Sequence, residues 1–454
     1  MTTLAAQISD QQVSPRTPIF EEGKKTKAAL YFVRNGKVEL KSAAGRHQII
    51  DDGGYFGEDL LTIDTQGVQN TDEIEAKYTV TTLGEEVVVG VLNIEDLRKY
   101  IDTTLIGKGK QLRTLDSMAG VDIRLDSLEK HAILGAGTFG QVWLVSYNEG
   151  GKKRPYALKI QSKYELVKNH QAKGVVQEKR IMAKLNHPFI IRLVQSYQDK
   201  QNVYMLLGIV QGGELFSLLH TATADGMPEK KACFYAAGII EGLSYMHRRD
   251  IIYRDLKPEN VLIDKDGYPV IVDMGFAKHV PAKTYTLCGT PLYLAPEVIL
   301  NRGHDKGADH WSYAVLLYEM LAGYTPFYTE GMDQITLFKS VCRGEYQFPA
   351  GGLMSIELED LIQRFFVIDP AKRLGSLARG INEIYAHQWF RSQSINFNDL
   401  RHKDITAPWV PTLKDPLDRT NFENWDHLED KATKKDPPIS EKHQKIFENF
   451  ESSV

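Results

Sequence analysis

A glycine-rich turn between two strand-like runs constrains the fold of this chain most strongly. Residues 135–140 read Gly-Ala-Gly-Thr-Phe-Gly, and the β-type residues 142–145 follow directly. In dinucleotide-binding folds the same glycine spacing leads into a helix. Here the turn joins two strands, and such a loop can lie over phosphate groups as a flap. Taken alone, the motif is equally compatible with an ordinary glycine-rich hairpin.

Two charged residues after this turn suit a nucleotide phosphate site. Lys159 ends the strand-like run Tyr-Ala-Leu-Lys, where an ammonium group can meet the phosphates. Glu178 lies in the helix expected over residues 175–185 and is a candidate partner that would hold this lysine in place. Each residue by itself is more simply an ordinary surface charge.

A second cluster combines a carboxylate with ligands for a hard cation. Asp255 and Asn260 share one short loop, and Asp273 follows the strand-like run 269–272. Asp255 can accept the proton of an attacking hydroxyl group, whereas Asn260 and Asp273 carry oxygen atoms that Mg²⁺ prefers. The ordered series of motifs predicts phosphoryl transfer.

With these motifs in this order, residues 128–390 resemble the eukaryotic protein kinases. The resemblance implies a bilobal fold that binds ATP and Mg²⁺, with Asp255 as catalytic base and Lys257 steadying the transferred phosphoryl group. Asn260 and Asp273 would bind Mg²⁺. The nucleotide-binding residues that the resemblance implies are Gly135, Ala136, Gly137, Thr138, Phe139, Gly140, Val142, Ala157, Lys159, Leu207, Val210, Glu214 and Asp273.

The resemblance also implies two ion pairs. Lys159 and Glu178 would form the pair of the active state, and Glu297 and Arg373 would form a buried structural pair of the large lobe. One departure is Met274, which stands where phenylalanine is usual. Methionine is flexible and apolar, so it can fill that position between the lobes.

Residues 284–291 resemble the activation segment of the cyclic-nucleotide-dependent kinases, which belong to the AGC group. Thr286 matches their activating phosphothreonine, and this implies an upstream activating kinase. Arg254 and Lys278 would pair with the phosphate. The alternative is an unmodified loop threonine.

Three carboxylates would set the substrate preference. By resemblance, Glu214, Glu259 and Glu319 bind arginines or lysines that precede the target Ser or Thr. Charge-assisted bonds between arginine and carboxylate give this selectivity a physical basis. Each carboxylate alone is more simply a solvated surface charge.

The last part of the chain resembles the C-terminal tail of the AGC-group kinases. Residues 420–425 resemble the motif that places an aromatic side chain beside the adenine pocket. Phe447 and Phe450 resemble the hydrophobic motif that docks on the small lobe. Glu451 stands where relatives controlled by tail phosphorylation have Ser or Thr, and its charge would favour permanent docking.

Residues 18–108 resemble a cyclic-nucleotide-binding domain, a β-roll with a closing helix expected over 94–101. An Asn-Gly pair at 35–36 predicts a hairpin turn there. Gly57 and Glu58 would lie at the ribose of cGMP or cAMP. The family places an arginine shortly after this point, but the run 59–73 contains acidic residues and no Arg or Lys.

Two interpretations of this domain stay open. It has either lost nucleotide binding and remains a regulatory or docking module, or it binds weakly through backbone N–H groups and Lys77, the first basic residue after the acidic run. A cyclic-nucleotide-binding domain followed by this kinase type resembles the layout of the cGMP-dependent protein kinases.

The predicted fold class is therefore α+β. The expected parts are a flexible N-terminus, a β-roll, a linker, a kinase domain and a tail, with boundaries at 1–17, 18–108, 109–127, 128–390 and 391–454.

Composition excludes several other classes. The chain has 55 Lys and Arg against 59 Asp and Glu, so it lacks the positive charge of a general nucleic-acid binder. It has no apolar stretch long enough to cross a bilayer and no basic-then-apolar start typical of a secretory signal. Its three cysteines are too scattered for a disulfide framework. A cytoplasmic location is expected.

The sequence thus predicts a serine/threonine kinase that acts on ATP and on basic protein substrates, with regulation by cGMP as a further expectation. One alternative is a kinase of the same group that ignores cyclic nucleotides. Another is a non-catalytic scaffold, against which the intact Lys159, Asp255, Asn260 and Asp273 argue.

Overall fold

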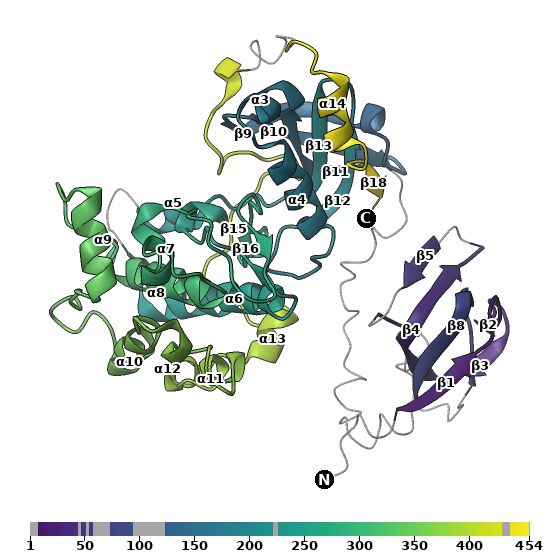
Figure 1. The fold of residues 1–454 in the computed structure, drawn as a ribbon, viewed down its shortest axis with the longest axis horizontal. Coiled ribbons are helices and arrows are strands. Elements are labelled where there is room, and N and C mark those ends of the chain that lie inside the picture. Colours follow the sequence, from purple (N-terminus) through teal and green to yellow (C-terminus); the bar gives the residue numbers. More distant parts are fainter. Residues whose placement is uncertain are drawn as a thin grey trace. The chain divides into compact units, whose positions relative to one another are not determined.

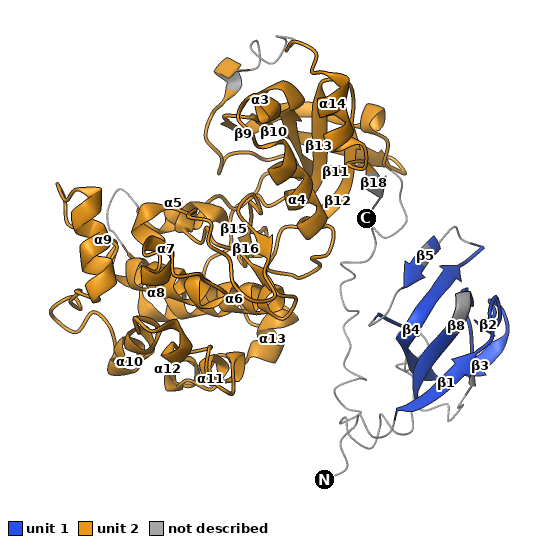
Figure 2. Cartoon of the chain, in the orientation of Figure 1, with its two compact units in different colours: residues 1–122 blue, residues 123–454 orange. Residues whose placement is uncertain are grey.

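The chain forms two compact units, residues 1–122 and 123–454, in this computed structural model (Figure 2). The structure describes residues 8–43, 47–50, 54–57, 73–93, 123–220, 226–428 and 436–453. The described part of the first unit consists of strands, whereas the second combines a sheet with helices (Figure 1). The predicted α+β fold class is confirmed.

The first unit is an antiparallel roll in which two long strands form the centre. The main sheet runs β1-β8-β4-β5, with β2 on β8 and β6 on β4, and β3 pairs with β7. Alternate residues of β4 are buried at both of its ends, as expected for a strand with one face on a core. The strands are β1 (Ser9–Val13), β2 (Pro18–Phe20), β3 (Lys25–Lys27), β4 (Ala29–Lys41), β5 (His47–Ile50), β6 (Tyr55–Phe56), β7 (Glu73–Glu75) and β8 (Thr79–Asn93).

The hairpin predicted at residues 35–36 is wrong. β4 continues through this point and stays paired with β8 from Ala29 to Lys41, with register shifts on both sides of Asn35. Gly36 has a φ of 92°, a conformation that suits glycine in a bulge. Because β8 offers a partner along the whole length, the Asn-Gly pair is accommodated as a bulge instead of a turn.

Residues 9–13, expected to be part of a flexible N-terminus, form β1 and pair with residues 87–91 of β8. This strand therefore belongs to the roll. The helix predicted over residues 94–101 lies outside the described residues.

The second unit begins with an antiparallel sheet of strand order β18-β12-β13-β11-β10-β9. Helices α3, α4 and α14 accompany this sheet in Figure 1. Its last strand in space comes from the end of the chain, since Ser452 and Ser453 pair with Ser196 and Gln195 of β12. The elements are β9 (Glu129–Gly137), β10 (Gly140–Glu149), β11 (Lys152–Ser162), α3 (Lys163–Lys168), α4 (Ala172–Met182), β12 (Leu193–Gln198), β13 (Asn202–Gly208), α14 (Glu441–Gln444) and β18 (Ser452–Ser453).

The rest of this unit is mainly helical, and α6 and α8 form its centre. Nearly every residue of α8 is buried, which explains the apolar sequence all around this helix. The helices are α5 (Leu215–Leu219), α6 (Glu229–His247), α7 (Pro296–Ile299), α8 (Gly307–Ala322), α9 (Gln334–Arg343), α10 (Ile356–Phe365), α11 (Ile381–Tyr385), α12 (Gln388–Ser392) and α13 (Phe397–Arg401). The short strands are β14 (Ile251–Ile252), β15 (Val261–Ile263), β16 (Pro269–Ile271) and β17 (Lys278–His279).

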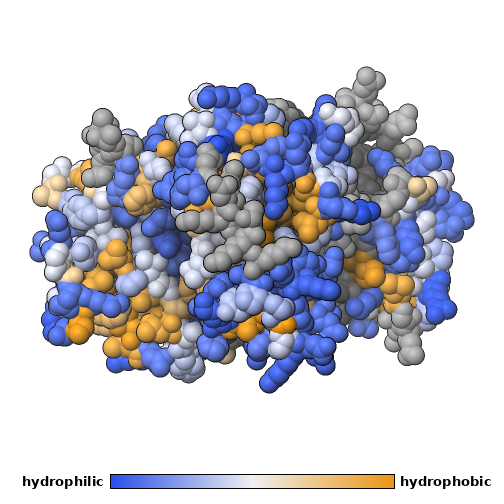
Figure 3. Space-filling view, turned by 90° about the horizontal axis from the view of Figure 1, so that it is seen from above, coloured by the Kyte–Doolittle hydropathy of each residue, from blue (hydrophilic) through white to orange (hydrophobic). Residues whose placement is uncertain are grey.

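The face drawn in Figure 3 is mostly hydrophilic and is interrupted by separate groups of hydrophobic residues. Within the described part of the chain, no helix combines the length and the apolar character that a membrane span requires.

Candidate functional site

A cavity of about 550 Å³ is lined by the sheet, the helical part and the tail of the second unit. The strands contribute Leu134, Ala157, Lys159 and Leu207 among others, and the tail contributes Asn421, Phe422, Glu423 and Trp425. Of the predicted nucleotide-binding residues, those that line the cavity are Gly135, Ala136, Val142, Ala157, Lys159, Leu207, Val210, Glu214 and Asp273. The tip of the glycine-rich turn, residues 137–140, does not line it.

The three glycines of that turn are needed for different physical reasons. A Cβ atom on Gly140 would lie 1.8 Å from the carbonyl oxygen of Ile160, so the packing of β10 on β11 requires glycine there. A Cβ atom on Gly135 or Gly137 would meet no atom within 4 Å. These two positions leave open space beside the cavity, which suits a bulky anionic ligand.

Lys159 and Glu178 form an ion pair across the cavity wall, with 2.7 Å between Nζ and Oε1. β11 supplies the lysine and α4 supplies the glutamate. Asp273 Oδ1 lies 3.7 Å from the same Nζ atom. Burial lowers the pKa of Lys159, but the attraction of Glu178 and Asp273 outweighs it and raises the pKa overall. The lysine therefore keeps its positive charge inside the cavity.

The loop that carries Asp255 is held by Asp309, a fully buried residue of α8. Asp309 Oδ2 accepts a hydrogen bond from the Tyr253 backbone N–H at 2.9 Å, and Oδ1 accepts one from the Arg254 N–H at 2.7 Å. His247 Nε2 lies 2.7 Å from the same carboxylate. Arg254 has a φ of 69°, so these bonds fix a backbone turn that an L-residue rarely adopts.

Asp255 is nearly buried and points its two oxygen atoms at different partners. Asn260 Nδ2 donates to Oδ2 at 2.7 Å, and Thr290 Oγ1 donates to Oδ1 at 3.1 Å. Lys257 Nζ lies 3.9 Å from Oδ2. Burial, the largest influence, raises the pKa of Asp255 above its ordinary value. A carboxylate that is oriented in this way and poorly solvated is suited to accept a proton.

The predicted magnesium ligands fit a hard cation. Asn260 and Asp273 both line the cavity. Asn260 donates from Nδ2 to the carbonyl oxygen and to Oδ2 of Asp255, and these two hydrogen bonds fix the orientation of its side-chain amide. The attraction of Lys159 lowers the pKa of Asp273, so its carboxylate is charged. Among the described residues, no group of three His, Cys, Asp or Glu side chains forms a metal cage. An ion here would need further oxygens from a phosphate ligand.

Met274 is fully buried, as are its neighbours in the same apolar cluster, Met182, Leu193 and Tyr253. The Tyr253 hydroxyl donates to the Val272 carbonyl oxygen at 2.5 Å. Met274 therefore packs in an apolar environment between the sheet and the helical part, and the nearby Tyr253 hydroxyl has a hydrogen-bond partner.

The three predicted substrate carboxylates are not equivalent. Glu214 and Glu259 line the cavity together with Glu423 of the tail. Burial, and then the charges of Glu259 and Glu423, raise the pKa of Glu214. Glu319 does not line the cavity; it is buried and accepts a hydrogen bond from the Tyr293 hydroxyl, with His220 Nε2 3.7 Å away.

The predicted phosphorylation site Thr286 is exposed. Lys278 Nζ donates to the Thr284 hydroxyl at 2.9 Å. Arg254 Nε donates to the Phe276 carbonyl oxygen at 2.8 Å. Arg254 Nη1 is buried and has no hydrogen-bond partner among the described residues. Such a group is costly to leave unpaired, so this atom is available to an added acceptor.

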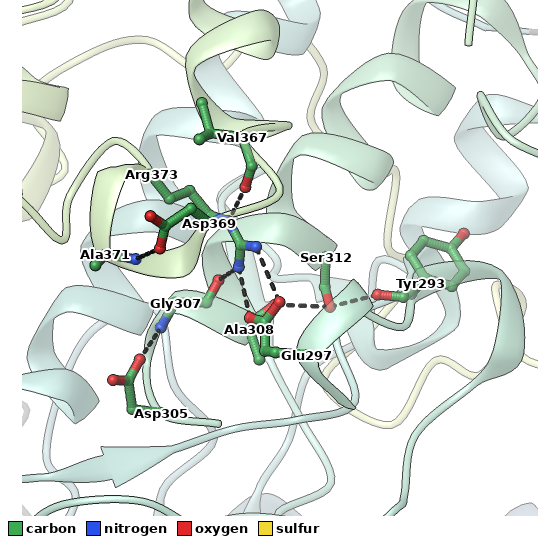
Figure 4. Close-up of polar contacts among 10 residues, drawn as sticks. All are labelled: Tyr293, Glu297, Asp305, Gly307, Ala308, Ser312, Val367, Asp369, Ala371 and Arg373. Atoms are coloured by element: carbon green, nitrogen blue, oxygen red, sulfur yellow. Dashed lines mark hydrogen bonds and ion pairs between the residues drawn. The ribbon is translucent and has the colours of Figure 1, made fainter. Parts of the chain in front are cut away.

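Glu297 and Arg373 form a fully buried, bidentate ion pair (Figure 4). Arg373 Nη1 and Nη2 donate to the two oxygens of Glu297 at 2.7 and 3.0 Å. Nη1 also donates to the Gly307 carbonyl oxygen at 2.6 Å, and Nε donates to that of Val367 at 3.1 Å. The pair joins α7 to the start of α8 and to the segment before η6 (Pro370–Lys372).

The tail contacts the unit at two places. Phe422 packs on the apolar cluster of Leu134, Leu144 and Ala157 at the cavity wall, and Trp425 lines the cavity. Phe447 and Phe450 are fully buried beside the sheet. The Phe450 carbonyl oxygen accepts a hydrogen bond from the Ser196 hydroxyl at 2.7 Å.

The predicted site residues include neither Gln211, which bonds to the tail near the cavity, nor Glu423, although Glu423 lies in the tail motif of residues 420–425. Their contacts depend on where the tail lies in space, which the tail motif indicates only for its aromatic side chain. In the first unit, Gly57 is required by the fold, because its Cβ atom would lie 2.7 Å from the Ala29 carbonyl oxygen. Glu58 and residues 59–72 of the acidic run lie outside the described residues, whereas Lys77 is exposed.

Comparison with known proteins gives two family matches. The protein kinase domain model matches residues 128–390, and the cyclic nucleotide-binding domain model matches residues 10–104. The chain is 38% identical to the cAMP-dependent protein kinase catalytic subunit of Dictyostelium discoideum over 330 residues, which are 72% of this chain and 49% of the relative. It is 42% identical to cAMP-dependent protein kinase type 3 of Saccharomyces cerevisiae over 281 residues, 62% of this chain and 68% of the relative.

The chain is also similar to a relative that matches both domains. It is 34% identical to human cGMP-dependent protein kinase 2 over 441 residues, 90% of this chain and 57% of that protein. The chain thus spans about half the length of the Dictyostelium relative and little more than half that of the human one.

Proposed function

Because the chain belongs to the protein kinase family, we propose that it transfers the γ-phosphoryl group of ATP to Ser or Thr in basic protein sequences. The observation that supports this most is the convergence of Lys159, Glu178, Asn260 and Asp273 on one cavity, with Asp255 hydrogen-bonded to Asn260 beside it.

Each of these residues has a separate task. Lys159, held by Glu178, supplies a fixed positive charge for the nucleotide phosphates. Asp255 accepts the proton of the attacking hydroxyl group, and Lys257 beside it counters negative charge on the transferred group. Mg²⁺, held by Asn260 and Asp273, supplies charge neutralisation on the phosphates when it is bound. Phosphoryl transfer depends mainly on such positioning and charge stabilisation.

The acidic lining supports a preference for basic substrates. Glu214, Glu259 and Glu423 line the cavity, and the charges of Glu259 and Glu423 act on Glu214. Such carboxylates can form charge-assisted hydrogen bonds with arginine. Glu319 is committed to Tyr293 and would contribute only if that bond opens.

We expect Glu214→Gln to lower kcat/KM for an arginine-rich seryl peptide by about 10- to 100-fold, the loss of a charge-assisted hydrogen bond. A peptide without arginine should be affected much less. Steady-state kinetics with both peptides would measure this. Glu345→Gln is the matched control, since Glu345 is exposed and lies outside the cavity. Equal losses for both peptides would contradict the proposed substrate preference.

We propose that phosphorylation of Thr286 by an upstream kinase activates the enzyme. A phosphate there would offer acceptors to Arg254 and Lys278 and would order the segment next to the Asp255 loop. Preventing it with Thr286→Ala should lower kcat/KM by about tenfold or more, as expected when a few charge-assisted bonds are missing. Mass spectrometry of the phosphate and peptide kinetics would test this, with Tyr285→Phe as the neighbouring control. Full activity of unphosphorylated Thr286→Ala would contradict it.

Regulation by a cyclic nucleotide is proposed as the role of the first unit, and cGMP is favoured by the domain order shared with human cGMP-dependent protein kinase 2. A kinase that does not respond to cyclic nucleotides is the second candidate, favoured by the acidic run 59–73. Peptide phosphorylation with cGMP, with cAMP and with neither separates the two, because only the first candidate predicts a change in rate.

A further inference from the structure

A segment of the tail is fastened across the end of β13 by one buried side chain. We call residues 416–425 the strap. Gln211, which follows β13 and is only 5% exposed, donates from Nε2 to the carbonyl oxygens of Pro416 at 3.0 Å and Asp418 at 2.9 Å. In return, Asn421 Nδ2 donates to the Gln211 carbonyl oxygen at 2.9 Å. Three hydrogen bonds thus join residues that lie some two hundred positions apart in the sequence.

Hydrogen bonds within the tail fix the conformation of the strap around Asp418. Asp418 Oδ1 accepts hydrogen bonds from the backbone N–H and the hydroxyl group of Thr420, and Oδ2 accepts one from the Lys414 N–H at 2.7 Å. The strap also lies directly on the neighbouring glycine. A Cβ atom on Gly213, whose φ is +81°, would lie 2.9 Å from the Asn421 carbonyl oxygen. The close fit leaves no room for another residue there.

The three hydrogen bonds between Gln211 and the strap, which we call the clamp, hold the strap beside the cavity. Leu417 and Phe422 of the strap pack against the apolar cluster of Leu134, Leu144 and Ala157. Asn421, Phe422, Glu423 and Trp425 of the strap line the cavity. The hydrogen bonds from Gln211 hold the strap at Pro416 and Asp418, close in sequence to the residues that line the cavity.

We propose that Gln211 is a positioning residue that holds the strap over the nucleotide cavity, so that Phe422 closes the apolar side of the bound nucleotide. This inference rests on the proposed ATP-binding function and adds to it a specific determinant of nucleotide affinity. Gln211 does not touch the reacting groups, and it acts through Phe422. The clamp lowers the conformational cost of binding, since the strap is already ordered before the nucleotide arrives.

The test uses the full chain with Gln211→Met, which keeps the length of the side chain but removes both donor hydrogens. We expect the Kd for Mg-ATP, measured by calorimetry, and the KM for ATP to rise about five- to twenty-fold, the effect of losing one or two buried hydrogen bonds. The kcat at saturating ATP should stay within about twofold of the wild type, because the clamp acts on binding and not on the transfer step.

A double-mutant cycle separates this role from a purely structural one. Phe422→Ala should raise the Kd for Mg-ATP as well, and Gln211→Met should add less than about twofold to it, because both act through the same contact. Where Gln211→Met does not fold, Gln211→Ala, which also removes both donors and leaves space for water, enters the same cycle.

An unchanged Kd in a folded variant, or fully additive effects of the two substitutions, would overturn the role of Gln211 alone. No binding of Mg-ATP to the wild type would overturn the proposed function and this inference together.

Discussion

Replacing Asp255 with asparagine should lower kcat for peptide phosphorylation by about 10²–10⁴-fold, the range typical of losing a positioned general base. Asparagine has nearly the shape of aspartate but cannot take up a proton. Its amide would also face the Asn260 Nδ2 donor that now bonds Asp255 Oδ2 at 2.7 Å. Asp255 does not line the nucleotide cavity, so the Kd for Mg-ATP should change by no more than about threefold.

Initial rates at saturating ATP and peptide, together with calorimetry, measure the two quantities separately. Asp266→Asn, the same change at a partly exposed position of the β15–β16 turn, is the matched control. A rate within tenfold of the wild type would place the proton acceptor elsewhere.

The pH dependence of kcat offers a second readout of Asp255. Burial raises the pKa of this carboxyl group, and only its deprotonated form can accept a proton. Activity should therefore be complete at neutral pH and fall as the pH drops through this raised pKa. The acidic limb should lie above the range of an ordinary aspartate, and Asp255→Asn should lose it.

Breaking the ion pair between Glu297 and Arg373 should produce the largest loss of stability. Glu297→Gln leaves the fully buried Arg373 charge with only the carbonyl oxygens of Gly307 and Val367 and a neutral amide. Removing one partner of a buried pair typically costs about 3–5 kcal/mol, because the other charge stays buried without compensation. Urea unfolding followed by tryptophan fluorescence measures the change.

The chain has five tryptophans, and all of them lie after residue 122. The fluorescence signal therefore reports on the second unit alone. Arg364→Gln is the control, because its pair with Asp360 is half-exposed and should contribute less than about 1 kcal/mol. Equal decreases in the free energy of unfolding for the two variants would show that the buried pair contributes no more to stability than the half-exposed one.

Much of the candidate site in the second unit could be predicted because its residues belong to short motifs that follow one another in a fixed order. Lys159 lies within β11, Asp255 and Asn260 lie on the short segment between β14 and β15, and Asp273 follows β16. Each of them belongs to a short motif, so local sequence identifies the residue. The protein kinase domain model matches residues 128–390, which carry all of these motifs.

The errors and omissions have a common physical cause, since each depends on contacts between distant parts of the chain. The Asn35-Gly36 pair carries a strong local turn signal, but pairing with β8 along the whole of β4 overrides it. Gln211 has no motif around it, and its importance follows only from the position of residues 416–421. Glu423 lies in the tail motif of residues 420–425, but its position near Glu214 depends on where tertiary structure places the tail.

The most direct test of the proposed kinase activity is transfer of the γ-phosphoryl group from ATP to an arginine-rich seryl peptide, followed by mass spectrometry. The wild-type chain with Mg²⁺ should yield phosphoserine peptide, and Asp273→Ala, which removes one proposed metal ligand at the cavity, should yield almost none. No phosphopeptide from the wild type, or equal amounts from both proteins, would contradict the assignment of this cavity as a phosphoryl-transfer site.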